Sequence, residues 1–357
     1  MMSGHQRQRG AALVIVLMMF AIVVTLSVEV LYRQDHFRTR TANLLSWDER
    51  YQYAMAAEAL AIRALIDDLE NDQQSGTLTD DCVSDRWAVN LPPTPYESAF
   101  LSASVQDLQG RFNINWLIRA EADEFVRDPE ARLQLEQLLA RVLPQPNRAA
   151  VLSMELADWL DSNNLVDDVD GAEDAEYRYQ RTANTPVLHE SEMRALRSFT
   201  LEDTGADPFW GFFTALPLGT RLNINTAPEP VLSAVFSDTV AEPGVQLVMQ
   251  LREEGAIESV DAVLAQAPFS ALTADQRSAL SNRLDVRSDY FQVMVDVRTD
   301  QGLTRLATRI VRPADGETAV FSRQLVPVLA PLEPACNPLY NQADNTTPVI
   351  ESGVEPE

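Results

Sequence analysis

One uninterrupted apolar run near the start of the chain limits what this sequence can fold into. Residues 11–28 read AALVIVLMMFAIVVTLSV and contain no charged side chain. At 1.5 Å per residue, such a run forms a helix of about 27 Å, close to the thickness of the hydrocarbon layer of a bilayer. The run therefore predicts a membrane-spanning helix. Arg7 and Arg9 before it favour a cytoplasmic start, with the rest of the chain on the other side.

The residues on either side of the run distinguish two kinds of N-terminal signal. A secretory signal peptide is cut after its apolar core, near small residues, but here EVLYRQD follows at 29–35. A short polar leader, residues 1–10, instead ends in Gly10 and is followed at once by Ala11. This order resembles that of type IV prepilins, which are cut after the glycine and keep the helix. We therefore expect cleavage between Gly10 and Ala11; a plain signal anchor is the alternative on this segment alone.

A helical pattern continues beyond the membrane-spanning run. From residue 44 to 69, apolar residues recur every three or four positions and so share one helical face. They are Trp47, Tyr51, Met55, Ala59, Ile62, Ile66 and Leu69. The pattern stops at residues 71–76, NDQQSG. One helix over about 11–70 is expected, with the stripe on its second half packed against the rest of the protein.

The remainder of the chain predicts a sheet interrupted by helices. Alternating patterns predict strands at 100–106, 290–299, 303–312 and 317–328, whereas the prolines in 90–96 predict turns. Residues 116–285 carry helical patterns, among them 122–142, 229–235 and 273–283, with no evident internal repeat. The expected fold class is α+β, with a long transmembrane helix packed on a small antiparallel sheet and a large inserted all-helical domain. The expected division is 1–10 (leader), 11–75 (helix), 76–111 and 286–330 (sheet domain), 112–285 (inserted domain) and 331–357 (disordered tail).

The charge of the chain excludes several kinds of function. Its 28 basic residues are all Arg, and 53 acidic residues bring the net charge to −25. Without Lys there is no Schiff-base amine and no phosphate-binding loop of the G-x-x-x-x-G-K-[ST] type. Because so acidic a chain is repelled by phosphate backbones, no nucleic-acid partner is expected.

The densest group of acids lies in residues 155–176, which contain nine Asp or Glu and no basic residue. Oxygen ligands of this kind suit Ca²⁺. The spacing is not that of an EF-hand, because Asp161 and Asn163 are followed by Leu165 and Val166 where that loop needs Asp or Asn and then Gly. An irregular calcium site and a solvated acidic loop both remain open on spacing alone.

Catalytic patterns are missing from the sequence. Three histidines, one of them in the leader, form no H-E-x-x-H motif, and no G-x-S-x-G motif occurs. The sequence therefore favours a protein that is not an enzyme. Cys82 and Cys336 could form one disulfide in an oxidising compartment, or remain two separate thiols in a reducing one.

Several stretches of the chain, taken in order, resemble one known family. They are RGAALVIVL at 9–17, DLQGRFNINWL at 107–117, LADWLD at 156–161, GAED at 171–174, SEMRAL at 191–196 and LNINTAP at 222–228. Together they are similar to the K class of type II secretion system minor pseudopilins, the general secretion pathway protein K family, up to about residue 325. Most pilins and pseudopilins carry Glu at the fifth mature position. Here that position is Ile15, as in the K class.

The resemblance implies a fold, a location and partners. The fold is a pilin-like sheet with an inserted domain of sterile-alpha-motif-like helices. The leader would be removed by a prepilin peptidase, leaving a single-pass anchor in the inner membrane and a periplasmic head. The partners would be the I- and J-class minor pseudopilins and the major pseudopilin. The subunit would start and cap the periplasmic pseudopilus, which aids export of folded proteins across the outer membrane.

The resemblance also implies calcium in the inserted domain. The ligands carried onto this sequence are Asp161, Asn163, Asp167, Asp170, Glu173 and Asp174. Two other functions fit parts of the sequence. One is a membrane-anchored periplasmic hydrolase that uses the acidic loop. The other is a minor pilin of a type IV pilus, against which Ile15 and the helical insert weigh.

Overall fold

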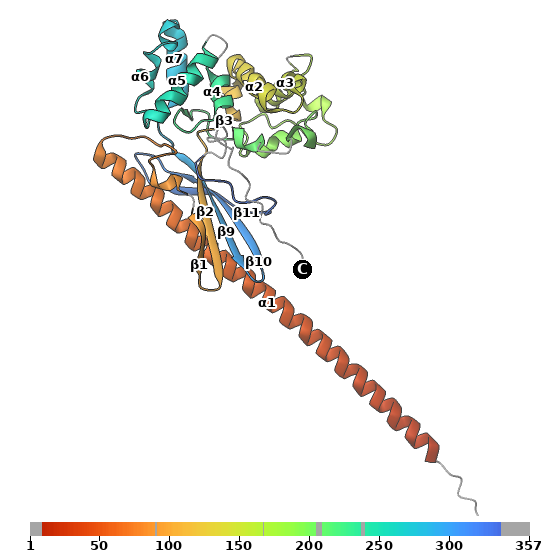
Figure 1. Cartoon of the computed structure of the whole chain (residues 1–357). Helices are drawn as coiled ribbons and strands as arrows, with labels where there is room; N and C mark the ends of the chain where they lie inside the picture. Colours follow the sequence, from red (N-terminus) through yellow and green to blue (C-terminus); the bar gives the residue numbers. More distant parts are fainter. Residues whose placement is uncertain (1–8, 90, 167, 205–208, 237–239, 337–357) are drawn as a thin grey trace, which may run out of the picture.

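The protein combines one very long helix with a compact head. The computed structural model describes residues 9–89, 91–166, 168–204, 209–236 and 240–336. Helix α1 (Arg9–Ser75) is unbroken over 67 residues, and its first half projects alone from the head (Figure 1). This confirms the predicted long helix. Its apolar N-terminal part is long enough to cross a membrane, and none of its side chains there is buried in the molecule.

The second half of α1 packs on one face of a five-stranded antiparallel sheet. The strands, in spatial order, are β1 (Leu91–Tyr96), β2 (Ala99–Asp107), β9 (Tyr290–Thr299), β10 (Gly302–Val311) and β11 (Ala319–Val326). The four predicted strands are confirmed to within two residues at each end. Strand β1 was expected to be a turn-rich segment because it contains three prolines. An edge strand tolerates them, since one side of its backbone needs no partner.

The contact between α1 and the sheet differs from the predicted stripe. The deepest helix side chains are Ala54, Ala57, Glu58, Leu65 and Asp68. The three apolar ones share a core with a row of buried residues on β9: Phe291, Val293, Val295 and Val297. Of the predicted stripe, Trp47 and Ala59 are exposed and the other five residues are only partly buried. Small alanines let the helix axis approach the sheet closely, so the helix is rotated toward its alanine face.

The inserted domain connects β2 to β9 and covers one end of the sheet (Figure 1). Its helices are α2 (Pro129–Val142), α3 (Ala149–Leu160), α4 (Glu229–Val235), α5 (Ala241–Glu254), α6 (Val260–Leu264) and α7 (Ala274–Arg283). Short 3-10 helices lie before and between these elements: η1 (Arg86–Ala88), η2 (Ile114–Leu117), η3 (Pro146–Arg148), η4 (Asp174–Glu176), η5 (Glu190–Ala195), η6 (Leu201–Thr204), η7 (Phe209–Phe212) and η8 (Phe269–Ala271). One large apolar core, separate from that under the sheet, holds the domain together.

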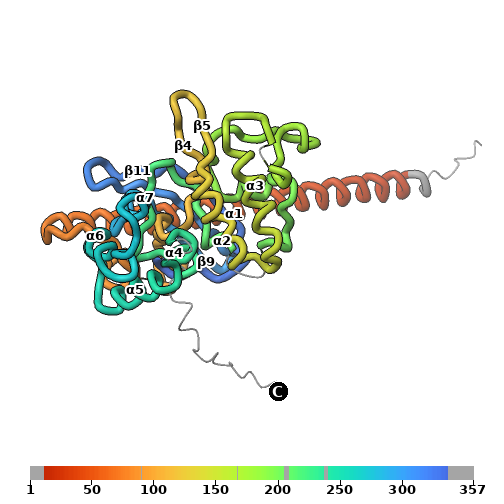
Figure 2. The backbone as a smooth tube through the Cα atoms, turned by 90° about the horizontal axis from the view of Figure 1, so that it is seen from above, coloured from red at the N-terminus to blue at the C-terminus, as the bar shows by residue number. Residues whose placement is uncertain are grey.

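This domain is not entirely helical. Its short strands are β3 (Phe112–Asn113), β4 (Ile118–Glu121), β5 (Glu124–Arg127), β6 (Phe213–Thr214), β7 (Leu222–Asn223) and β8 (Leu284–Asp285). The β4–β5 hairpin stands out from the rim of the head (Figure 2). The helix predicted from residue 122 therefore starts only at 129. There Asp128 accepts hydrogen bonds from two first-turn N–H groups and Pro129 fits the first helical position.

Two similar turns divide the inserted domain into two units. Residues 111–115 read RFNIN and residues 221–225 read RLNIN. In each, the first Asn accepts a hydrogen bond from the backbone N–H two residues later, at 3.1 Å for Asn113 and 2.9 Å for Asn223. Each turn also carries a two-residue strand that pairs in parallel with the strand closing its unit, β3 with β6 and β7 with β8.

The second Asn of each turn holds a loop in the same way. Asn115 donates to the backbone O of Val187 and accepts from its N–H, both at 2.9 Å. Asn225 does the same with Ile257, at 3.0 and 2.8 Å. The two units therefore share this turn and its hydrogen bonds, a likeness that was not predicted. Only the five-residue motif is similar between the two units. The segments from the motif to the strand that closes each unit differ in length, so the sequence shows no period.

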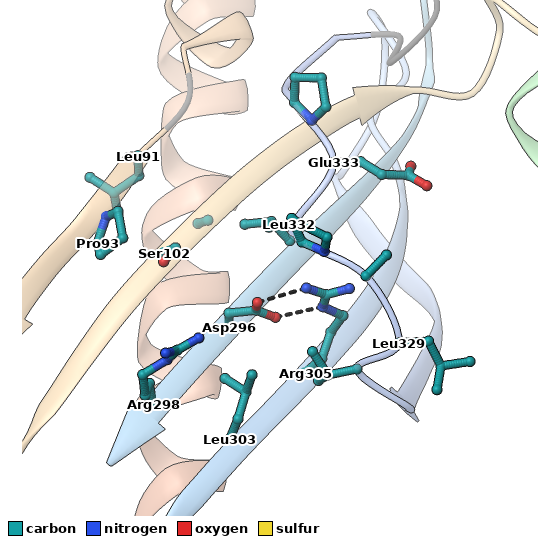
Figure 3. Close-up of a pocket in the computed structure, with 15 residues that line it drawn as sticks. Leu91, Pro93, Ser102, Asp296, Arg298, Leu303, Arg305, Leu329, Leu332 and Glu333 are labelled. Carbon is teal, nitrogen blue, oxygen red and sulfur yellow. Dashed lines mark hydrogen bonds and ion pairs between the residues drawn. The ribbon is translucent and has the colours of Figure 1, made fainter. Parts of the chain in front are cut away.

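The chain after β11 crosses the outer face of the sheet, opposite α1. Figure 3 shows Leu329, Leu332 and Glu333 lying over β9 and β10. Cys336 then bonds the β2 backbone, through its N–H to Val105 O (2.6 Å) and its O to the N–H of Asp107 (2.9 Å). Residues 331–336, predicted to begin a disordered tail, are thus held against the sheet. Residues 337–357 lie outside the described residues.

Candidate metal centre

Three buried carboxylates meet beside the C-terminal end of α3. Asp158 lies in the last turn of that helix, Asp161 is the residue just after it, and Glu173 precedes the short helix η4. Each is at most 1% exposed, and one oxygen from each lies within 4.8 Å of the others. Asp158 and Asp161 are three residues apart, which places them on one side of the helix end.

A guanidinium from a neighbouring strand faces this group. Arg127, at the end of β5, forms ion pairs with Asp158 and with Asp161, the latter at 2.5 Å from Nε to Oδ2. Among the described residues, this guanidinium alone is ion-paired with the three carboxylates. That leaves excess negative charge in a buried place, which is unfavourable unless a further cation or a proton compensates it.

Two oxygens of the group lack donors. Oδ2 of Asp158 and Oε1 of Glu173 are buried and accept no hydrogen bond from any residue that the structure describes. Burial raises the pKa of Glu173 to about 7, partly offset by the hydroxyl of Thr182, which donates to its other oxygen at 3.1 Å. Carboxylate oxygens are ligands for hard metal cations. The donor set therefore fits a hard metal ion.

Gly171 completes the wall of this group. Its α-carbon faces the carboxylate of Asp158 so closely that a Cβ there would collide with Oδ2. The loop between Asp161 and Glu173 can close over the carboxylates only because residue 171 has no side chain.

The structure separates the six predicted ligands. Asp161 and Glu173 belong to the group. Asn163 lies beside it, donating to Asp161 Oδ1 at 3.0 Å, and Asp174 accepts the N–H and hydroxyl of Thr182 at 2.9 and 3.0 Å. Asp170 is exposed, and Asp167 lies outside the described residues. The assignment of individual ligands stays a prediction.

Asp158 was not among the predicted ligands. The signal that could have identified it is its spacing: Asp158 and Asp161 are three apart at a helix end, in the D-W-L-D stretch. The partner Arg127 could not have been predicted, because it comes from a strand of an unexpected hairpin.

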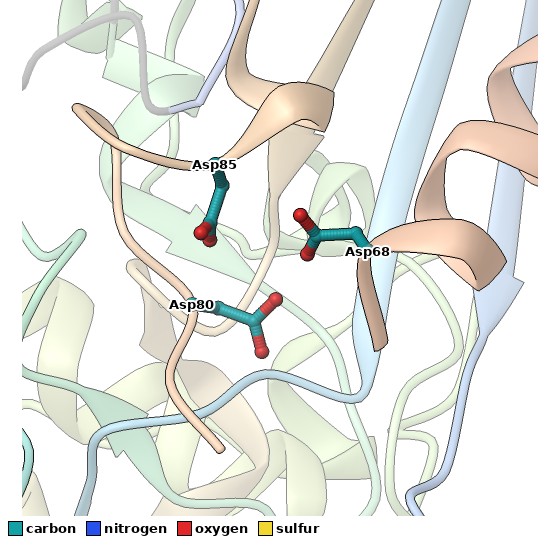
Figure 4. Close-up of side chains that lie close together, drawn as sticks. All are labelled: Asp68, Asp80 and Asp85. Carbon is teal, nitrogen blue, oxygen red and sulfur yellow. The ribbon is translucent and has the colours of Figure 1, made fainter. Parts of the chain in front are cut away.

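A second group of buried acids lies where α1 ends. Asp68 of α1 and Asp80 and Asp85 of the following loop point toward one another (Figure 4). Arg312, which is 1% exposed, forms ion pairs with Asp80 at 2.5 Å and Asp68 at 3.5 Å. A carboxylate oxygen of Asp85 accepts a hydrogen bond from the indole N–H of Trp87 at 3.0 Å. Unlike the first group, it has no buried carboxylate oxygen without a hydrogen bond among the described residues.

The remaining predicted sites are the cleavage site and the two cysteines. Gly10 and Ala11 fall in the first turn of α1, and residues 1–8 lie outside the described residues. Cys82 and Cys336 are joined by a disulfide, with Cα atoms 5.4 Å apart. It ties the loop after α1 to the segment that crosses the sheet.

Comparison with known proteins points to one family. Residues 110–206 and residues 222–287 each match a family model described as Type II secretion system (T2SS), protein K. These ranges coincide closely with the two units of the inserted domain. A relative named Type II secretion system protein K from Pseudomonas aeruginosa is 29% identical over 89% of this chain and 93% of its own length. Another from Aeromonas hydrophila is 28% identical over 90% and 98%.

A solved structure has the same architecture. It is described as the crystal structure of the GspK-GspI-GspJ complex from the enterotoxigenic Escherichia coli Type 2 Secretion System. The matched chain is 25% identical with a TM-score of 0.67, and the match covers 81% of this chain and 100% of that one.

Proposed function

Because this chain belongs to the protein K family of type II secretion systems, we propose that it is a membrane-anchored minor pseudopilin without enzymatic activity of its own. The observation that carries the proposal is the combination of a bare apolar helix with a head whose two inserted units both match the family. A chain of this kind supplies an anchor, a helix for assembly and a broad head.

The anchor is the first half of α1. A prepilin peptidase would cut between Gly10 and Ala11 and leave the helix in the inner membrane, with the head in the periplasm. The periplasm is oxidising, which agrees with the disulfide between Cys82 and Cys336.

The partners in this proposal are the I- and J-class minor pseudopilins, because the solved relative is in a complex with GspI and GspJ. A head with a large inserted domain is too wide to repeat along a thin fibre, so it suits the tip, above the major pseudopilin. From there the complex would start pseudopilus assembly and aid export of folded proteins.

The buried group of Asp158, Asp161 and Glu173 would hold calcium. Bound Ca²⁺ would supply positive charge to a loop that is otherwise closed over unpaired carboxylate oxygens. The metal in this proposal is structural: it fixes the loop between α3 and η4 and takes no part in chemistry.

The assembly proposal is tested by co-purification from membranes. The full-length chain, carrying an affinity tag after residue 357, is co-expressed with the I- and J-class pseudopilins of the same bacterium and extracted in mild detergent. We expect both partners to be recovered with it in fixed proportion. Recovery of neither partner would reject the proposal.

The calcium proposal makes a separate prediction. Titration of the calcium-stripped full-length protein with Ca²⁺ should release or absorb heat and raise the melting temperature by several degrees. Asp158→Asn should weaken binding at least tenfold, because it removes the charge of one ligand. Asp168→Asn, an exposed acid of the same loop, serves as the matched control and should bind as the wild type does. Equal binding by both variants would contradict the assignment.

A further inference from the structure

Three arginines follow the membrane-spanning run before α1 reaches the head. Arg33, Arg38 and Arg40 lie on the part of α1 that projects alone (Figure 1), and all three are exposed. Arg33 is neutralised by Glu29 one turn earlier, with its Nε 2.7 Å from Oε1. Arg38 and Arg40 form no ion pair with any residue that the structure describes. These two guanidinium groups are therefore available to a partner outside the chain.

The length of the helix places Arg38 and Arg40 at the surface of a bilayer. A hydrocarbon layer of about 30 Å that begins at Ala11 ends near Val30, at about 1.5 Å per residue. The two arginines then lie about 12 and 15 Å further along, and headgroups fill roughly the first 5–8 Å of that distance. Side chains on an α-helix point back toward its N-terminus, so an extended Arg reaches about 6 Å back, to the headgroups.

Aromatic side chains mark the same level of the helix. Tyr32 and Phe37 are 62% and 71% exposed, and the Tyr32 ring packs edge-on against His36 with ring centres 4.3 Å apart. Tyr is enriched where a membrane meets water, because its ring is apolar and its hydroxyl is polar. The segment from 32 to 40 therefore fits the headgroup layer by its aromatic residues as well as by its arginines.

The acidity of the head does not cancel the positive charge of this segment. Between Glu29 and Asp48 the sequence contains one acid, Asp35, against three arginines. Asp48, the next acid, lies about 27 Å beyond Val30 along the helix, whereas salt screens exposed charges over about 8 Å. Arginines just after a span, on the side away from the cytoplasm, also run against the positive-inside rule, and an anionic partner on that side accounts for them.

Arg38 and Arg40 lie on opposite sides of the helix. Residues two positions apart are about 200° apart around an α-helix, so they do not share a face. One neighbouring helix can therefore meet only one of the two guanidinium groups. A bilayer surrounds its anchor on all sides, so its headgroups can meet both. The placement favours lipid over an acidic side chain of a neighbouring subunit.

We propose that Arg38 and Arg40 bind the phosphates of acidic phospholipids on the periplasmic side of the inner membrane and so hold α1 at a fixed depth. The inference rests on the proposed function, which places the head in the periplasm. A guanidinium group pairs with phosphate through two parallel N–H donors. A lipid with a net negative charge adds an attraction to Arg that a zwitterionic lipid lacks.

The test counts the lipids that stay bound to the full-length protein. The protein is reconstituted in nanodiscs of equal parts phosphatidylglycerol and phosphatidylcholine, extracted in uncharged detergent and measured by native mass spectrometry. The wild type should retain phosphatidylglycerol at least fivefold over phosphatidylcholine, and Arg38→Gln with Arg40→Gln should lower this ratio at least threefold. Arg86→Gln with Arg298→Gln removes two exposed arginines of the head and should keep the wild-type ratio.

Three outcomes of this experiment overturn the inference. They are equal retention of the two lipids by the wild type, an unchanged ratio in the variant of Arg38 and Arg40, and an equal loss in the control variant. Loss of the I- or J-class partner by the first variant at an unchanged lipid ratio would assign these arginines to a protein contact instead. A wild-type chain that does not stay in the membrane rejects the proposed function itself, whereas a membrane-bound wild type without lipid preference rejects the inference alone.

Discussion

Buried carboxylates decide much of the chemistry of this protein at the scale of single residues. The sequence shows where acids are dense, and it placed Asp161 and Glu173 in one candidate site. It could not show that Asp68, Asp80 and Asp85 would converge, because Arg312, which holds two of them, lies more than 200 residues away in sequence. Contacts of that range depend on the completed sheet, not on any local pattern.

Asp85 carries the clearest prediction at this scale. Burial, together with the charges of Asp68 and Asp80, raises the pKa of Asp85 to about 8, whereas an unfolded Asp titrates near 4. Between these values the folded state binds the proton that the unfolded state has lost. Between about pH 4 and pH 8, each rise of one pH unit therefore lowers the free energy of unfolding. Asp85 contributes at most about 1.4 kcal/mol to this decrease per pH unit.

The comparison of wild type with Asp85→Asn measures this effect. The amide cannot ionise but can still accept from Trp87, so the variant should lose less stability than the wild type as pH rises from 5 to 8. Thermal melts of the full-length protein in detergent across that range check it, with exposed Asp300→Asn as the control that should follow the wild type. Parallel curves for wild type and Asp85→Asn would contradict the raised pKa.

At the scale of elements, local signals were a good guide to regular helices and strands. Helix α4 was predicted with its observed bounds and α7 to within one residue. A capping box of Thr273 and Gln276 fixes the start of α7. The β4–β5 hairpin and β1 were missed, because a short hairpin at a rim and a proline-rich edge lack the alternation that marks a strand. The paired Asn turns were missed because their regularity lies in hydrogen bonds.

The second of these turns should be sensitive to substitution. Asn223 is fully buried, and its side-chain amide donates to the backbone O of Asp80 at 2.9 Å and to the hydroxyl of Ser288 at 2.9 Å. Asn223→Ala leaves several buried groups without partners and should lower the free energy of unfolding by about 2–4 kcal/mol. Asn282→Ala, at an exposed position on α7, should change it by less than about 0.5 kcal/mol. Chemical denaturation of both variants checks the difference; similar small effects would mean that the turn is not a structural lock.

At the scale of the whole molecule, the order of the elements could be predicted from the sequence. The packing of the last described segment across the sheet could not. A long helix, a sheet split by an insert and a helical block were all expected. The segment from 331 to 336 was expected to be disordered, because its prolines and polar neighbours resemble a tail. It is ordered by contacts with β2 and by the disulfide, which no local pattern encodes.

The disulfide closes a very long loop of the chain. Cys82 and Cys336 are 254 residues apart in sequence, and bridges of this kind typically contribute about 2–5 kcal/mol by restricting the unfolded chain. Reduction, or Cys82→Ser with Cys336→Ser, should lower the melting temperature and expose residues 328–336 to protease. After reduction and alkylation of the unfolded protein, we expect the wild type to gain the mass of two alkyl groups. The double Ser variant should keep its mass. Alkylation of the wild type without prior reduction would show that the bridge does not form.

The most direct test of the proposed function is the N-terminus of the mature protein in its own membrane. Intact-mass and N-terminal peptide measurements on protein extracted from inner membranes should show a chain that begins at Ala11 and keeps all of α1. A freely soluble mature chain that begins beyond residue 30 would have lost both its anchor and its assembly helix, and would contradict a pseudopilin.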